Sequence, residues 1–155
     1  MTQPERVDPD TIADLSGNAA EGELVFHASG CASCHAAPDA EGDAKLVLSG
    51  GQRFPSPFGT FLAPNISSDP DVGIGGWSDE EIVSAVMYGT SPNGRHYYPA
   101  FPYVSYRRAE PQDVVDLAAF LRTLPADPTP SDAHELGFPY NIRRGIGFWK
   151  LLYVS

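Results

Sequence analysis

The chain lacks long hydrophobic runs, and basic side chains are scarce in it. No apolar stretch approaches the roughly 18 residues that a membrane-crossing helix needs. Ten Lys and Arg face twenty Asp and Glu, a formal net charge of -10. That charge repels phosphate backbones and excludes DNA or RNA as a partner. Hydrophobic residues at 42% and aromatic residues at 11% are too plentiful for a disordered chain, so we expect one folded domain.

The N-terminus has neither the basic start nor the apolar stretch of a signal peptide, since the chain begins Met-Thr-Gln-Pro-Glu. Either the protein stays in the cytoplasm or the sequence has been trimmed.

Cysteine is also scarce, and the spacing of the two cysteines decides between their uses. Cys31 and Cys34 stand in Cys-Ala-Ser-Cys-His, the C-x-x-C-H pattern that attaches c-type haem. The two thiols add to the porphyrin vinyl groups as thioethers, and His35 is placed to coordinate the iron. A thioredoxin-like redox pair would need a βαβ pattern nearby, and a zinc site would need two more ligands at short spacing. Neither is evident, so we interpret the motif as a haem attachment site.

Three segments predict helices around this motif. Residues 19–29 carry Ala20, Leu24 and Ala28 at four-residue spacing, with Val25 and Phe26 alongside. Ser78 begins a capping box, the helix continues through Ile82, Val83 and Val86, and Gly89 provides a left-handed stop. From Pro111 onward an i, i+3, i+4, i+7 pattern is formed by Val114, Leu117, Ala118, Leu121 and Leu124.

Between the first two helices, residues 50–76 contain too many glycines and prolines for a long helix or a central strand. Their apolar residues nevertheless indicate that this segment buries surface, and a flat haem would provide that surface. The alternative is a loop that covers one face of the helical core. The apolar residues are Phe54, Phe58, Phe61, Leu62 and Ile66.

Five sequence blocks resemble, in order, those of class I c-type cytochromes. They are C31-A-S-C-H35, F58-G-T-F-x-x-P-N-I-S67, G73-I-G-G-W-S78, G94-R-H-Y-Y-P-A-F-P-Y103 and F138-P-Y-N-I-R143. More narrowly, the chain resembles the N-terminal haem domain of cytochrome subunits that serve bacterial alcohol and aldehyde dehydrogenases, and related membrane-anchored mono-haem cytochromes.

The resemblance implies an all-α cytochrome c fold, with three or more helices and long Gly/Pro-rich loops wrapping one covalent haem c. Residues 1–18 would be an extension or linker, and 19–155 the haem domain. The implied function is electron transfer without substrate chemistry, between a periplasmic dehydrogenase and an oxidase or another cytochrome. Because haem attachment occurs outside the cytoplasm, we expect a periplasmic location. We also expect an apolar N-terminal segment, missing from this sequence, that anchors the protein to the inner membrane.

One departure from the family concerns the sixth iron ligand. Where relatives carry the methionine that binds iron, this chain has Phe101. Some relatives carry another methionine just before the last helix, and that position is Ala109 here. Phenylalanine cannot bind iron, so the ligand comes from elsewhere, or is water, or is absent. Our first candidate is His96, in the same loop, because imidazole binds iron well. The next candidate is Met87, although a helical methionine more often fills a core.

Further residues are candidates for contact with the haem. Trp77 would donate its indole N–H to a propionate, and Arg95, within a family block, would neutralise one. The alternative for Trp77 is packing, and for Arg95 a solvated surface. If the distal position is open, the competing function is a small-ligand sensor or a haem enzyme.

Overall fold

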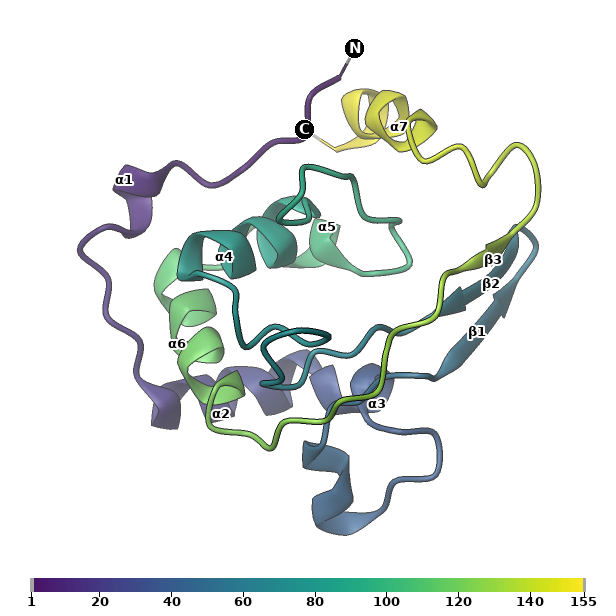
Figure 1. The fold of residues 1–155 in the computed structure, drawn as a ribbon. Helices are drawn as coiled ribbons and strands as arrows, with labels where there is room; N and C mark the ends of the chain where they lie inside the picture. The colour runs from purple at the N-terminus through teal and green to yellow at the C-terminus, as the bar shows by residue number, and fades with distance from the viewer. Residues whose placement is uncertain (1, 155) are drawn as a thin grey trace.

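The computed structural model describes residues 2–154, and helices frame it as the sequence predicts. In chain order the elements are α1 (Pro9–Ile12), α2 (Ala19–Ser29), α3 (Cys31–His35), the 3₁₀ turn η1 (Gly42–Leu46), β1 (Arg53–Ser56), β2 (Gly59–Leu62), α4 (Asp79–Tyr88), α5 (Tyr103–Tyr106), α6 (Pro111–Leu121), β3 (Glu135–Leu136) and α7 (Gly145–Tyr153). Figure 1 shows α2 and α6 crossing at one corner, the strands at the opposite side, and α7 near both termini.

The crossing of α2 and α6 depends on a glycine. A Cβ atom placed on Gly22 would lie 1.9 Å from the Asp116 carbonyl oxygen and 2.9 Å from Cβ of Phe120. Real Cβ atoms do not come that close, so only glycine lets the two backbones touch. The Asp116 carboxylate also accepts a hydrogen bond from the Asn18 backbone N–H at 2.7 Å. Helices from distant parts of the sequence are thereby joined directly.

The predicted helix at 19–29 is confirmed, but the face predicted for burial is wrong. Leu24 is 65% exposed, and Ala20 and Ala28 are exposed as well. Of the residues named in the predicted pattern, Phe26 is buried, and the other buried residue of the helix is Gly22. A pattern of apolar residues predicts no contact for a glycine, whereas in α2 it is at Gly22 that the partner helix α6 comes closest.

The other two predicted helices are confirmed, and α4 also begins and ends as predicted. Ser78 and Glu81 form the reciprocal capping box of α4, and Gly89 ends the helix in the left-handed conformation with φ 61°. The predicted stripe of α6 is buried throughout: Val114, Leu117, Ala118, Leu121 and Leu124. Leu117, Ala118, Leu121 and Leu124 form the main core with Phe26, Leu48, Ile74, Ile82 and Phe120, whereas Val114 packs in a separate cluster.

Residues 50–76 contain a β-hairpin that the all-α prediction omitted. Strands β1 and β2 pair antiparallel, with Phe54 opposite Phe61, and β3 pairs with β2. The strands are short. Phe54 and Phe58 are 39% and 47% exposed rather than buried, whereas Leu62 is buried as predicted. The architecture is therefore helical with one small three-stranded sheet.

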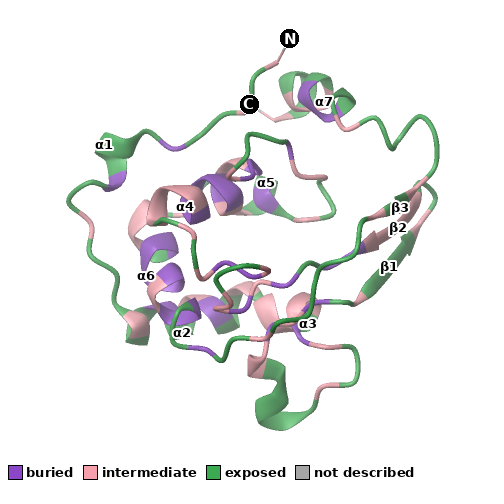
Figure 2. Cartoon of the chain, viewed as in Figure 1, coloured by how far each residue is buried: buried purple, intermediate pink, exposed green. Residues whose placement is uncertain are grey.

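Both ends of the chain pack on the framework. The N-terminal segment contributes Val7 and Ile12 to a second core cluster. At the other end, Lys150 of α7 donates to the carbonyls of Tyr88 and Gly89 at 2.8 and 2.9 Å, which places a cation at the C-terminus of α4. Figure 2 shows that much of α7 is exposed, whereas α4 and α6 are largely buried. Within residues 2–154 no helix is long and apolar enough to span a membrane.

Candidate functional site

The C-x-x-C-H motif forms its own short helix, α3, directly after α2. Gly30 separates the two helices in the left-handed conformation, with φ 67°, and its N–H closes the end of α2. Both cysteine thiols are free and only partly buried. Burial, with the neighbouring Cys34 as a smaller cause, raises the pKa of Cys31 to about 11, so this thiol is protonated at neutral pH. The folded chain thus places the two cysteine sulfurs one helical turn apart, with no disulfide between them.

His35 has one ring nitrogen held in place by the protein. Its Nδ1 lies 2.9 Å from the Pro64 carbonyl oxygen. A carbonyl can only accept, so Nδ1 carries the proton and Nε2 keeps its lone pair. Burial lowers the pKa of His35, which favours the neutral imidazole. An outer hydrogen bond of this kind orients a metal-binding histidine and fixes its tautomer.

Gly50 holds the Pro64 carbonyl beside the motif. Its N–H donates to the His35 carbonyl at 2.7 Å. Its φ is 74°, and an added Cβ would lie 2.5 Å from the Pro64 carbonyl carbon. Next to the open end of the hairpin, the Gly51 N–H donates to the Ala63 carbonyl at 2.9 Å. The loop predicted to wrap a cofactor therefore positions the histidine, a role that sequence reasoning did not give to Pro64.

An aromatic wall, formed by the side chains of Tyr106, Phe101 and Tyr97, leads from the cysteines into the loop before α6. The hydroxyl of Tyr106 donates to the Ser29 carbonyl at 2.9 Å, at the end of α2. Burial raises the pKa of Tyr106, and the nearby Cys31 and Cys34 raise it further. The ring of Phe101 lies 6.3 Å from that of Tyr106, and the ring of Tyr97 lies 6.0 Å from that of Phe101. The sequence showed several tyrosines here but not their connection to the cysteines.

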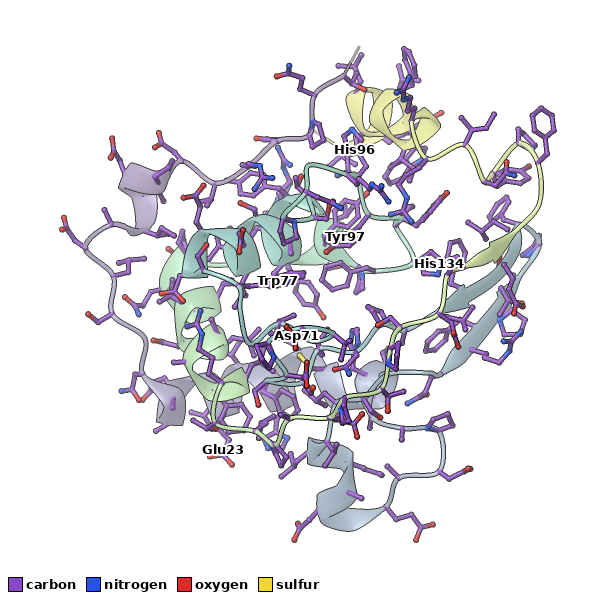
Figure 3. All side chains as sticks on the ribbon, in the orientation of Figure 1. Glu23, Asp71, Trp77, His96, Tyr97 and His134 are labelled. Carbon is purple, nitrogen blue, oxygen red and sulfur yellow. The ribbon has the colours of Figure 1, made fainter. Side chains whose placement is uncertain are left out.

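His96, the first candidate for the sixth ligand, faces away from this wall. It forms an isolated β-bridge with Thr90, so neighbouring side chains point to opposite sides. Its Nε2 lies 3.4 Å from the Thr2 carbonyl oxygen and 3.0 Å from the place of a Cβ on Gly147. Figure 3 shows His96 beside α7 and the N-terminal segment, whereas Tyr97 lies on the inner side of the loop, toward Trp77. Ligation by His96 stays a prediction, and this placement counts against it.

The two methionine-related positions also pack elsewhere. Met87 is 5% exposed and lies in the second core cluster with Val7, Val83 and Val114. Ala109 packs against the same cluster. The alternative interpretation of Met87, core filling, is the one that its surroundings favour.

The remaining two histidines have local partners. His134 accepts the Leu62 backbone N–H at Nδ1, at 3.0 Å, so its proton sits on Nε2. It joins β2 to the segment after α6, a structural role that the sequence did not reveal. His27 is exposed, with Glu23 4.0 Å away on the same helix.

Trp77 and Arg95 have different surroundings. Trp77 is partly buried against the main core, and its carbonyl accepts from Arg122 at 3.1 Å. Arg95 is exposed, and its backbone closes a turn with Ser91. Their contacts with haem propionates stay predictions.

Comparison with known proteins identifies the family. The cytochrome c family model matches residues 19–125, more than half of the chain. The chain belongs to the cytochrome c family. Its function is accordingly electron transfer by haem c, as the motif and the resemblance predicted.

Several relatives are cytochrome subunits or domains of larger proteins. This cytochrome c is 57% identical over 152 residues to a diheme cytochrome c-type protein from Cereibacter sphaeroides, covering 98% of this chain and 51% of that protein. It is 35% identical to the fructose dehydrogenase cytochrome subunit of Gluconobacter japonicus, covering 84% of this chain and 26% of that protein. It is also 31% identical to the cytochrome c subunit of a quinone-dependent alcohol dehydrogenase from Gluconobacter oxydans, covering 86% and 27%. The chain thus spans about half the length of its diheme relative and less of the others.

The donor set fits the haem c that the family implies. Two free thiols precede a histidine whose Nδ1 is already bonded and whose Nε2 is available. Partly buried apolar side chains continue from the motif along the main core: Val25, Cys31, Ala32, Leu46, Ile66, Trp77 and Val86. A flat apolar ring attached at the cysteines would find both its covalent partners and apolar surface.

Proposed function

We propose that this cytochrome c carries one haem, attached through Cys31 and Cys34 and ligated by His35. The observation that carries the proposal is the bond between Nδ1 of His35 and the Pro64 carbonyl, beside two free thiols. It leaves one nitrogen lone pair available in a fixed orientation. When bound, the haem supplies a one-electron ferric/ferrous couple.

The protein's contribution to electron transfer is to hold its surroundings still. Gly50 and Pro64 fix the imidazole that would hold the iron. The hydrogen bond from Nδ1 makes the imidazole more basic, and axial ligand properties tune the reduction potential. The aromatic side chains of the loop before α6, Tyr97, Phe101 and Tyr106, would shield the bound haem from water.

Attachment is tested on protein produced with a haem-attachment system. We expect covalent haem on denaturing gels, one iron per chain, and a pyridine haemochrome spectrum of haem c. The Cys31→Ser, Cys34→Ser double variant should release its haem on acid–acetone extraction, because the thioethers alone make the attachment covalent. The matched control is Ser33→Ala, which leaves both cysteines in place and removes only an exposed hydroxyl that lies 3.9 Å from Cys34 Sγ. Haem that resists extraction from the double variant would overturn the assignment.

We further propose that the partners are a periplasmic dehydrogenase and a respiratory acceptor. This is supported by relatives named as cytochrome subunits of fructose, alcohol and gluconate dehydrogenases. Anchoring to the inner membrane through a segment outside this sequence, and the haem domain at residues 19–155, belong to the same proposal. In this proposal residues 2–18 pack against the haem domain, since the Val7 N–H donates to the Ser84 hydroxyl at 3.1 Å.

Acidic charge suits docking to a basic partner. With a net charge of -10, electron transfer to a basic cytochrome should slow as salt rises, because the screening length falls from about 30 Å at 0.01 M to about 10 Å at 0.1 M. Stopped-flow rates across this range test the idea. A flat salt profile would show that the acidity does not steer docking.

A further inference from the structure

The loop before α6 places aromatic rings where relatives place a ligand. Phe101 takes the position of the family's methionine, and its ring contacts the rings of Tyr97, Tyr103 and Tyr106 at centroid distances of 6.0 to 6.3 Å. A phenyl ring offers no lone pair. Because Tyr106 approaches the cysteines, this cluster belongs to the same side of the molecule as the attachment motif.

The other candidate ligands are held by contacts of their own. The carbonyl of His96 accepts from Arg143 at 3.1 Å, while its ring packs against Thr2 and Gly147. Because side chains alternate across the Thr90 bridge, bringing that ring to the side of Tyr97 would require the backbone pairing to break. Met87 would have to leave the second core cluster. Either movement costs packing that the native fold already has.

Tyr97 is the polar group on the inner side of this loop. Its backbone N–H donates to the Gly89 carbonyl at 2.8 Å, which fixes its position, and its ring contacts Phe101 edge to face. Burial raises the pKa of Tyr97 to about 12, so the hydroxyl keeps its proton and can donate a hydrogen bond. Tyr106 is committed to the Ser29 carbonyl and is less available.

We propose that the sixth coordination position has no protein ligand and accepts a small neutral diatomic molecule, with Phe101 covering it and the Tyr97 hydroxyl donating to the bound molecule. This rests on the proposed attachment of haem at Cys31, Cys34 and His35. Neutral ligands are favoured over anions because the surrounding side chains, Tyr97, Phe101 and Tyr106, are aromatic and the chain carries a net charge of -10.

Carbon monoxide is the probe. The haem-loaded, dithionite-reduced protein should show a high-spin spectrum and bind carbon monoxide rapidly, with a shift of the Soret band. Phe101→Met should restore a thioether ligand, giving a low-spin spectrum and at least tenfold slower binding. Phe101→Leu is the matched control, because leucine replaces the ring without adding a donor atom, and it should still bind rapidly.

Tyr97→Phe tests the hydroxyl alone. Loss of one hydrogen bond should raise the carbon monoxide dissociation rate about fivefold and shift the stretching frequency of the bound molecule. An unchanged rate and frequency would overturn the role of Tyr97.

Two results would overturn the open position. One is a low-spin reduced protein that carbon monoxide cannot enter. The other is a low-spin spectrum that becomes high-spin in His96→Ala, which would make His96 the ligand after all. Both outcomes presuppose covalent haem in the pyridine haemochrome assay. Absence of haem there would instead refute the proposed function, so the two failures are distinguishable.

Discussion

Replacing Gly22 with alanine should separate the two helices that frame the protein. The added Cβ would lie 1.9 Å from the Asp116 carbonyl oxygen, whereas real contacts start near 3.0 Å, so the backbones must move apart by about 1 Å. The neighbouring Cβ of Phe120, at 2.9 Å, leaves no room for a sideways escape.

The cost can be worked out from this geometry. Overpacking of a well-packed core costs about 1–3 kcal/mol, and rigid backbone on the receiving side favours the upper end. Alanine regains about 1 kcal/mol of helix propensity over glycine. The net loss is therefore about 2 kcal/mol, which lowers Tm by roughly 4–8 °C for a chain of this size.

Thermal unfolding of the haem-loaded protein, followed by circular dichroism, measures the effect. The matched control is Gly145→Ala at the start of α7, where an added Cβ would meet nothing within 4 Å. That variant should unfold at the wild-type temperature or slightly above it. A Gly22→Ala protein as stable as Gly145→Ala would refute the direct contact of α2 with α6.

Three further predictions concern the parts that surround the site. Asn65→Ala removes hydrogen bonds to the carbonyls of Asp127 and Thr129 and from the Ser67 N–H, each at 2.8 Å, so urea titration should show a loss of about 3 kcal/mol. A loss below about 1 kcal/mol would contradict the buried clamp. Burial, and to a lesser degree the charge of Arg143, lowers the pKa of His134 from 6.5, so the unfolded state binds the proton first and the free energy of unfolding falls as pH drops below 6.5. His134→Asn should have a flatter stability profile between pH 7 and 5 than the wild type, and parallel profiles would contradict the assignment. Lys150→Met removes the cation from the end of α4, so amide exchange in α7 should accelerate at least tenfold while exchange in α6 stays unchanged. Equal protection of α7 in both proteins would show that Lys150 does not hold it.

The sequence predicted the parts of this fold that depend on local rules. The capping box at Ser78, the stop at Gly89 and the stripe on α6 require only neighbouring residues, and all three are present. The buried face of α2 was predicted wrongly because it depends on a contact between Gly22 and a helix more than ninety residues away. Such a contact leaves no periodic signal.

The candidate site, like the fold, was predicted from the sequence only where it depends on neighbouring residues. The attachment motif is contiguous, so its spacing alone pointed to haem. The partner of His35 is the backbone carbonyl of Pro64, and a carbonyl has no residue signature. The direction in which His96 points was also hidden, because it follows from a bridge to Thr90 and from the packing of α7.

The contact between α2 and α6 also bears on how such a molecule can change over evolutionary time. The backbone from residue 22 to residue 116 forms one large closed loop whose ends meet at a glycine. The entropy of closing a loop grows only logarithmically with its length, and even a doubling costs about 0.6 kcal/mol. Insertions and deletions between α2 and α6 therefore cost little folding free energy as long as the two helices still cross at Gly22. The loop before α6 can diversify while the framework beneath it stays the same.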